Sequence, residues 1–295
     1  MAGTAIFNSS FSFRFSRIPT QAQAQAPSTV PTSLTPSTKP IPRPHWASLH
    51  TEIETHLKQA IPMKEPLEVF QPMHHLVFSA PRTTVPALCL AACELVGGHR
   101  HQAMAAASAL LLNLANAHAH EQLPLTDRPK PRPGPAHAYD ARMELMTGDG
   151  LVPFGFELLA RADEPTHDNS ERILRVMIEI SRAVGSEGLQ HAQHMRNTLE
   201  SDGKELSHVE SMKRVAEKKE GGMHACGAAC GAVMGGGSEE EIERLRMFGF
   251  YVGMSQGMLQ RGLIQEAKEM KNMALQELQF FKDRDLHLIS TFINF

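Results

Sequence analysis

The sequence predicts an all-α protein, and three observations support this fold class. Aromatic residues make up only 6% of the 295 residues, whereas Ala and Leu recur along the chain together with 16 Met residues. This composition favours helices over sheets. Apolar residues repeat at helical spacing, and no alternating stretch of useful length predicts a strand. We therefore expect a bundle of about ten helices.

The first 45 residues differ in composition from the remainder. They contain no Asp or Glu, the first acidic residue is Glu52, and Ser, Thr, Pro and Gln dominate. Such a leader is typical of an organelle transit peptide, and its excess of hydroxyl residues over Arg favours the plastid over the mitochondrion. The alternative is a merely disordered tail. We expect residues 1–45 to be a plastid transit peptide and residues 46–295 to form one helical domain.

The first predicted helices lie on either side of a proline. Residues 46–61 have one apolar stripe at four-residue spacing, and Pro62 ends this helix. The stripe consists of Leu49, Ile53, Leu57 and Ile61. Pro86 fits the first turn of another helix, which is expected to run through two cysteines to Gly97 and Gly98. An Ala- and Leu-rich helix should follow over residues 102–119.

A proline-rich loop over residues 123–135 separates these helices from the later ones. Beyond it, Asn169 or Ser170 should cap a helix that ends at Gly185. The apolar positions of this helix are Ile173, Val176, Met177, Ile180 and Val184. Ser238 and Glu241 form the pattern of a capping box, which predicts the start of a further helix after the glycine turn.

Charge and hydropathy argue against two classes of partner. The chain has 29 basic and 32 acidic residues and a formal net charge of −3, so no broad basic surface for nucleic acid is expected. No run of about 18 apolar residues occurs, so no membrane-spanning helix is expected.

Three segments resemble, in the same order, segments of plant geranylgeranyl diphosphate synthases. They are CLAACELVGG (residues 89–98), GSEGL (185–189) and GAVMGGGSEEEIERLRMFG (231–249). The resemblance extends from about residue 44 to the C-terminus. It implies the isoprenoid-synthase helical bundle, which is usually dimeric. It also implies a chemistry in which magnesium ions hold the diphosphate while an allylic carbocation forms.

The two aspartate-rich motifs of that family, DDxxxxD and DDxxD, are degenerate in this chain. The six corresponding positions hold Glu121, Gln122, Asp127, Gln260, Arg261 and Ile264. Only Asp127 matches the motif. Magnesium prefers oxygen ligands, and an arginine in its place would repel the ion because the guanidinium does not lose its proton. The resemblance therefore implies no cofactor in this chain, with Mg²⁺ belonging to a catalytic partner.

The basic positions that hold the second diphosphate in the family are also depleted. The family motif GGKRxRP corresponds to APRTTVP at residues 80–86, in which only Arg82 is basic. A later lysine-threonine pair corresponds to Lys219 and Glu220. Because so many groups of one cluster are missing, we expect no catalytic residues and no reaction by this chain alone. The enzyme alternative is a prenyltransferase with weak residual geranyl or geranylgeranyl diphosphate synthase activity that relies on Glu121 and Asp127.

The four cysteines form two CxxxC pairs that allow four interpretations. The pairs are Cys89 with Cys93 and Cys226 with Cys230, and the spacing puts both thiols of each pair on one helix face. They could fill the core, bind zinc or form a disulfide. We favour the fourth interpretation, a small-residue face for a partner, formed by Cys89, Ala92, Cys93, Cys226 and Cys230.

The resemblance supports that choice. Non-catalytic small subunits of heterodimeric plant geranyl and geranylgeranyl diphosphate synthases have two such CxxxC motifs, associated with binding the large subunit. We therefore expect a chloroplast protein of the stroma, associated with thylakoids through its partners, that directs isoprenoid flux, for example to chlorophyll. The recruiting type of small subunit is favoured over a geranyl diphosphate synthase subunit for monoterpenes. Geranylgeranyl reductase is a further partner implied only by the resemblance.

Overall fold

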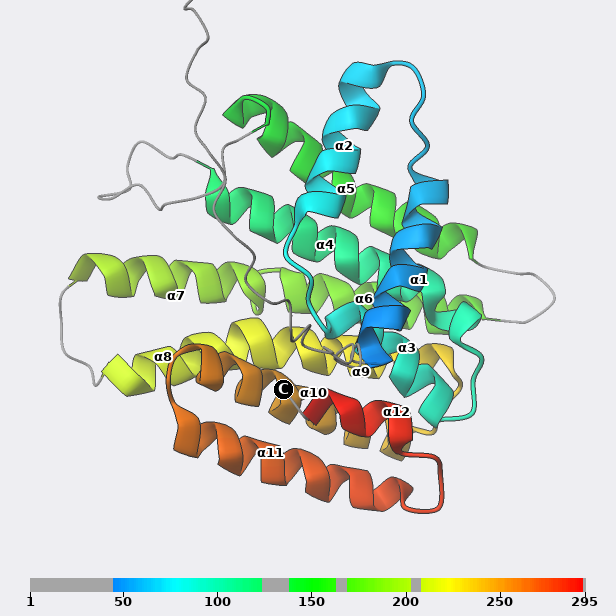
Figure 1. Ribbon diagram of the computed structural model, residues 1–295, viewed down its shortest axis with the longest axis vertical. Helices are drawn as coiled ribbons and strands as arrows, with labels where there is room; N and C mark the ends of the chain where they lie inside the picture. Colours follow the sequence, from blue (N-terminus) through cyan, green and yellow to red (C-terminus); the bar gives the residue numbers. More distant parts are fainter. Residues whose placement is uncertain (1–44, 124–137, 163–168, 203–207, 294–295) are drawn as a thin grey trace, which may run out of the picture. The chain divides into compact units, whose positions relative to one another are not determined.

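The computed structural model describes residues 45–123, 138–162, 169–202 and 208–293, and these residues are helical without a strand. The predicted all-α class is confirmed (Figure 1). The helices are α1 (His45–Ala60), α2 (Leu67–Ser79), α3 (Val85–Leu95), α4 (Met104–Gln122), α5 (Ala141–Arg161), α6 (Ser170–Val184), α7 (Leu189–Asp202), α8 (His208–Ala216), α9 (Gly222–Met234), α10 (Glu239–Gln260), α11 (Ile264–Leu278) and α12 (His287–Ser290). Shorter helical segments are the 3₁₀ turns Arg100–Ala103, Gln279–Phe281 and Thr291–Ile293 and the π-helical turn Glu217–Gly221.

Two of the predicted segments lie outside the described residues. These are the leader proposed as a transit peptide and almost all of the proline-rich loop, which includes Asp127. None of the described helices is long and apolar enough to cross a bilayer.

The apolar stripe of α1 is buried as the sequence predicts. Leu49, Ile53, Leu57 and Ile61 are at most 1% exposed. The helix itself ends at Ala60, one residue before the last member of the stripe and two before Pro62. The stripe belongs to the main core of the domain, together with residues of α3, α4, α9 and α10.

Helix α3 lies in the middle of this core. Pro86 is in its first turn, as expected, and every residue of the helix except Glu94 is buried. The helix packs against α4 and α9 (Figure 1). It ends at Leu95, earlier than predicted, and Gly97 then adopts a φ of 94°, a left-handed conformation that favours glycine.

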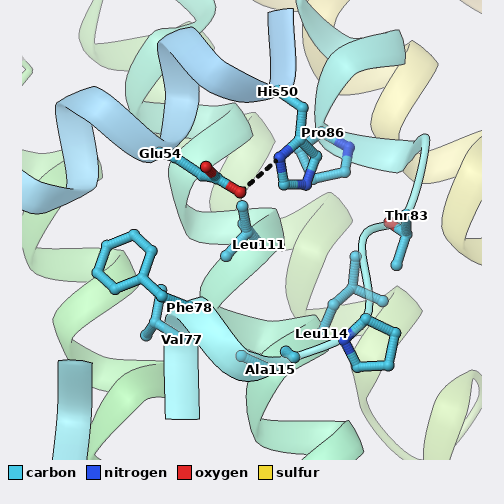
Figure 2. Close-up of a pocket in the computed structure, with 11 residues that line it drawn as sticks. His50, Glu54, Val77, Phe78, Thr83, Pro86, Leu111, Leu114 and Ala115 are labelled. Atoms are coloured by element: carbon cyan, nitrogen blue, oxygen red, sulfur yellow. Dashed lines mark ion pairs between the residues drawn. The ribbon is translucent and has the colours of Figure 1, made fainter. Parts of the chain in front are cut away.

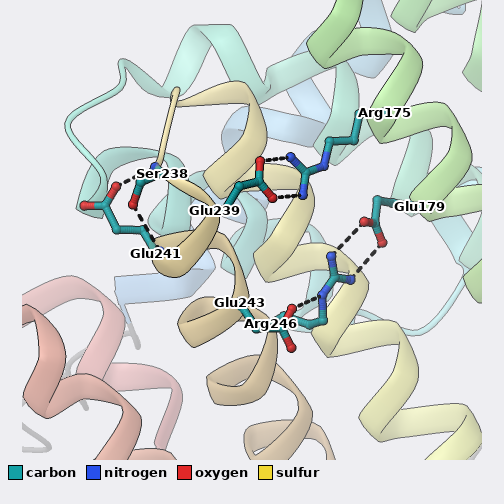
Figure 3. A network of polar contacts seen from close by, with 7 residues as sticks. All are labelled: Arg175, Glu179, Ser238, Glu239, Glu241, Glu243 and Arg246. Atoms are coloured by element: carbon teal, nitrogen blue, oxygen red, sulfur yellow. Dashed lines mark hydrogen bonds and ion pairs between the residues drawn. The ribbon is translucent and has the colours of Figure 1, made fainter.

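A polar network joins α6 to the start of α10 (Figure 3). The predicted capping box is confirmed, because Ser238 Oγ accepts from the Glu241 N–H and the Glu241 carboxylate accepts from the Ser238 N–H. Arg246 of α10 donates two hydrogen bonds, of 2.7 and 2.8 Å, to Glu179 of α6. Arg175 and Glu239 form a second two-bond pair between the same helices. These contacts fix the entry of α10 against α6.

The capping prediction for α6 is only partly right. The helix begins at Ser170 and ends before Gly185, and Ile173, Val176 and Ile180 are buried. Asn169 occupies the cap position, but its side chain accepts no hydrogen bond from the first turn. Its amide instead donates to the Ala162 carbonyl at the end of α5, so it links two helices rather than capping one.

Candidate functional site

A cavity of about 740 Å³ lies among α1, α3, α4, α9, α10 and the π-helical turn. This volume is in the range of small-molecule sites in proteins, about 300–1,000 Å³. The wall is mainly apolar, and its apolar side chains include Trp46, Leu114, Ala117, Leu189, Met223 and Leu259. Its acidic and basic side chains are Arg82, Glu121, Lys219 and Glu220.

Glu121, at the first degenerate aspartate position, lies in the last turn of α4 and faces a lysine. Lys219 Nζ donates to Glu121 Oε1 at 2.6 Å, and Arg196 Nη2 of α7 lies 3.6 Å from the same oxygen. Burial acts to raise the pKa of the Glu121 carboxyl, but Lys219 and Arg196 outweigh it and the pKa is lowered. The carboxylate is therefore ionised and already paired. Gln122 is half-buried at the helix end.

The second degenerate motif lies at the junction of α10 and α11. Gln260 lines the cavity and Ile264 is 59% exposed at the start of α11. Arg261 is not among the residues that line the cavity, which corrects the expectation of a cation pointing into it. Its guanidinium turns back, donating to the Gly257 carbonyl at 2.6 Å and to Glu220 at 3.2 Å.

The π-helical turn Glu217–Gly221 contacts both degenerate aspartate motifs. It places Lys219 against Glu121 and Glu220 against Arg261. Isolated π turns within α-helices are frequent at functional sites. Lys219 and Glu220 are recognisable in the sequence as the counterpart of a family motif, but their ion pairs are not predictable. Helical spacing of 3.6 residues does not show where an extra residue widens a turn.

A chain of hydrogen bonds forms the inner end of the cavity. The Glu220 carbonyl accepts from His224 Nδ1 at 2.6 Å, and Thr84 Oγ1 lies 2.8 Å from His224 Nε2. Because a carbonyl only accepts, Nδ1 must bear the ring proton, and Nε2 accepts from the Thr84 hydroxyl. Gln256 Nε2 in turn donates to Thr84 Oγ1 at 3.0 Å. Burial lowers the pKa of His224 to about 4, so the ring is neutral.

This polar chain was missed at the sequence level, although one signal for it exists. Gly249, Gly253 and Gly257 repeat every four residues along one face of α10. A Cβ at Gly253 would lie 2.2 Å from the Glu220 carbonyl oxygen, and one at Gly249 would lie 2.3 Å from the His224 carbonyl oxygen. Small residues at this spacing therefore let α10 approach the segment that holds His224.

Arg82, the one basic residue kept from the family motif, is held by α1. Two of its nitrogens donate to the Glu54 carboxylate at 3.1 Å each. His50 Nδ1 lies 3.1 Å from Oε1 of the same Glu54 carboxylate, beside a water-sized void of about 20 Å³ (Figure 2). Burial lowers the pKa of His50, although Glu54 opposes this effect, so Arg82 is the charged partner of Glu54.

The four cysteines lie inside the chain, between α3 and α9. Cys89, Cys93 and Cys230 are 0% exposed and Cys226 is 3% exposed, and Ala92 is also fully buried. The two CxxxC helices pack against each other (Figure 1). The small side chains of the CxxxC segments do allow two helices to approach closely, but the two helices are α3 and α9 of the same chain. A Cβ at Gly231 of α9 would lie 1.9 Å from the Cys89 carbonyl oxygen of α3.

The environment of Cys89, Cys93 and Cys230 keeps these three thiols protonated. Burial raises the pKa of Cys93 to about 12, and burial raises the pKa of Cys89 well above its ordinary value. The hydrogen bond with Cys226, together with burial, raises the pKa of Cys230. The two sulfurs of this second pair are 3.8 Å apart, and all four cysteines are free thiols. Among the described residues, no three His, Cys, Asp or Glu side chains converge as a metal site would require.

The described part of the cavity wall does not fit a magnesium cluster. Magnesium needs several oxygen ligands in near-octahedral geometry. Glu121 is hydrogen-bonded to Lys219, and Glu220 is paired with Arg261. At the second motif, Gln260, Arg261 and Ile264 supply no carboxylate. The wall therefore presents neutralised carboxylates rather than a set of free ligands.

Comparisons with known proteins place this arrangement. The helical fold and the cavity, whose carboxylates are paired with cations of the same chain, define an isoprenoid-synthase helical protein of the trans-prenyltransferase class. The geranyl diphosphate synthase small subunit of *Antirrhinum majus* superposes with a TM-score of 0.79 and 48% identity, over 85% of this chain and 98% of that one. A second solved structure superposes with a TM-score of 0.75 and 45% sequence identity, over 86% of this chain and 100% of that one. It is described as a mint deletion mutant of heterotetrameric geranyl pyrophosphate synthase in complex with ligands.

A sequence relative extends the same match. The chloroplastic heterodimeric geranylgeranyl pyrophosphate synthase small subunit 1 of *Cannabis sativa* is 44% identical over 265 residues, which covers 84% of each chain. No protein-family model matches the chain. The chain belongs to the family of small subunits of heterodimeric geranylgeranyl and geranyl diphosphate synthases.

Proposed function

We propose that this chain is a non-catalytic regulatory subunit that binds a plastid geranylgeranyl diphosphate synthase large subunit and modulates its activity or product length. One observation carries the proposal. In the described wall of the cavity, the carboxylates of Glu121 and Glu220 are each paired with a cation of the same chain. A site arranged in this way has no free ligands for the metal-held diphosphate on which the reaction depends.

The catalytic partner would then supply the Mg²⁺ and perform the ionisation step. Relatives of this chain are named as small subunits of heterodimeric synthases, and one similar solved structure is described as heterotetrameric. Binding of this chain could act by stabilising the large subunit or by reshaping its product cavity. The first effect raises geranylgeranyl diphosphate output, and the second shortens the product toward geranyl diphosphate.

Of these two outcomes we propose the first, in which a small subunit of the recruiting type raises geranylgeranyl diphosphate output. The flux is then directed to chlorophyll and other geranylgeranyl-derived products. Similarity to the geranyl diphosphate synthase small subunit of *Antirrhinum majus* supports the alternative of a monoterpene subunit. The chloroplastic names of the sequence relatives support a place in the chloroplast. Residues 1–45 as its transit peptide, and the stroma as its compartment, stay predictions. Contact with thylakoids or with geranylgeranyl reductase stays a prediction.

The role proposed for the CxxxC residues has to be indirect. Cys89, Ala92, Cys93 and Cys230 are fully buried, so they do not contact a partner unless α3 and α9 separate. We propose that they set the distance between these two helices, and thereby the shape of the surface that the partner binds.

Co-purification with a plastid geranylgeranyl diphosphate synthase tests the proposal. The wild-type chain should be retained by the tagged large subunit, and a chain with Ser at all four cysteine positions should be retained less. The thermal stability of that variant should fall in parallel, because the cause is packing. If the variant binds as tightly as the wild type, the CxxxC contact has no part in partner binding.

A second assay addresses the enzyme alternative. The purified chain, incubated with isopentenyl diphosphate, allylic diphosphates and Mg²⁺, should form no product above background. Turnover near the rate of an active large subunit would contradict the proposed function and would favour a prenyltransferase that uses Glu121 and Asp127.

A further inference from the structure

The cavity has a volume of about 740 Å³, and its charges are neutralised within the chain. Its described wall has two acidic and two basic side chains, and each has an intramolecular partner. Lys219 is held by Glu121 and Arg82 by Glu54. A diphosphate could bind only by displacing these carboxylates. The cavity therefore disfavours the anion that its volume would otherwise accommodate.

The remaining surface of the cavity is suited to an apolar chain. Trp46, Leu114, Met223 and Leu259 come from four different helices and line the same space. Contact between such side chains and an apolar ligand removes both surfaces from water, which is favourable in proportion to the area covered.

One hydrogen-bond acceptor in the cavity wall, Gln256 Oε1, competes with His224 Nε2 for the proton of the Thr84 hydroxyl. The Thr84 hydroxyl has a single proton, and the tautomer of His224 requires that proton at Nε2. Gln256 Oε1 lies 3.2 Å from Thr84 Oγ1, so it faces a hydroxyl whose proton is already used. An uncharged hydroxyl group of a ligand could donate to this oxygen.

From these observations we propose that the cavity binds a neutral amphiphile, an apolar chain ending in one uncharged hydroxyl group, with the hydroxyl at Gln256. The proposal goes beyond the partner-binding function and does not depend on it. A ligand of this class would brace α3, α9 and α10 from within, at the helices that also contain the cysteine pairs.

The single tryptophan of the chain provides the measurement, because Trp46 lines the cavity. The full chain is titrated with geranylgeraniol and, separately, with geranylgeranyl diphosphate in the presence and absence of Mg²⁺. These probes share one apolar chain and differ in the head group. We expect a saturable change in Trp46 emission with the alcohol and at least tenfold weaker binding of the diphosphate. Equal or tighter binding of the diphosphate, or binding of neither probe, overturns the proposal.

Three variants locate the bound alcohol. Ala117→Phe places a ring inside the cavity and should weaken binding of the alcohol at least tenfold, whereas Ala160→Phe, at an exposed position of α5, should leave binding intact. Gln256→Leu should weaken the alcohol about tenfold, the value of one buried hydrogen bond, without affecting a hydrocarbon of the same length. Unchanged binding by Ala117→Phe would show a site elsewhere and would overturn the proposal.

The reason for excluding the diphosphate is tested separately. Glu121→Gln removes the carboxylate from Lys219 and should raise the affinity for geranylgeranyl diphosphate about tenfold. The unfolding temperature and circular dichroism of each variant establish that it is folded before titration. If Glu121→Gln leaves diphosphate binding unchanged, internal neutralisation is not what excludes the anion.

Discussion

Helix α9 and the π-helical turn before it make two different kinds of contact, one by close packing and the other by ion pairs. Toward α3, the helix presents cysteines and glycines that pack without a gap, and Gly231 approaches the Cys89 backbone. Toward the cavity, the preceding π turn presents Lys219 and Glu220, and both are held by ion pairs. The first contact determines where the helices lie, and the second determines what the enclosed space can bind.

The largest expected effect comes from adding side-chain volume to the tight contact. Gly231→Val would place new atoms on the Cys89 carbonyl, where even a Cβ would lie 1.9 Å away. We expect the free energy of unfolding to fall by about 3 kcal/mol or more, because backbone must move. Thermal unfolding followed by circular dichroism measures this. Gly222→Ala on the same helix meets nothing closer than 3.6 Å and should be neutral or slightly stabilising.

If Gly231→Val unfolds at the wild-type temperature, the α3–α9 contact is looser than described.

The second effect concerns His224, which belongs to both regions. Its pKa is about 4 in the folded chain and 6.5 in the reference state, so the unfolded chain binds more protons between these values. Stability should therefore fall as the pH drops from about 6.5 toward 4, by about 3 kcal/mol in total. Urea unfolding at several pH values measures the slope.

The matched control is His224→Gln, measured at the same pH values. The pH slope of the wild type minus that of the variant isolates this ring from other histidines whose pKa values are lowered. An identical slope in both proteins would show that His224 takes up its proton at the same pH in the folded and the unfolded chain, contrary to the effect of its burial.

The third effect is smaller and concerns the ion pairs of the π-helical turn. Arg261→Gln removes the cation from Glu220, whose side chain is 14% exposed. We expect a loss of about 1–2 kcal/mol, because the pair is only partly buried. Arg161→Gln breaks the exposed pair with Glu157 and should have no measurable effect. Equal losses in the two variants would mean that the partial burial of the Arg261–Glu220 pair adds nothing to its contribution.

The smallest effect distinguishes volume from polarity at the tight contact. Cys230→Ser keeps the size of the buried side chain but adds a stronger polar group, whereas Cys230→Ala removes the sulfur. We expect each to lose about 1 kcal/mol, with Ser partly rescued by hydrogen bonding to its own helix. Chemical denaturation compares the two. A loss in Ser that greatly exceeds that in Ala would point to a thiol interaction beyond packing.

Most helices could be predicted because their signals are local. The stripe of α1, the proline of α3 and the capping box of α10 each depend on residues within one or two turns. The cap of α6 differs from the prediction because the Asn169 side chain bonds to the Ala162 carbonyl at the end of α5 instead of to the first turn of its own helix. Local patterns do not decide such a competition.

The candidate site was predictable in identity and not in geometry. The six degenerate positions could be named, but nothing in their spacing shows that Lys219 would reach Glu121 across 98 residues. The cysteine pairs were read as a face for a partner because one helix was considered at a time. Their true neighbours are on another helix of the same chain, so burial had to come from the fold.

By itself, the sequence determined the helical class, the missing aspartates and therefore the lack of a complete metal-binding motif, since these follow from residue type and short-range spacing. Only the tertiary structure decided which charges neutralise one another, that the cavity stays open, and that the thiols face inward. These depend on contacts between residues far apart in the chain, and such contacts exist only once the helices have packed.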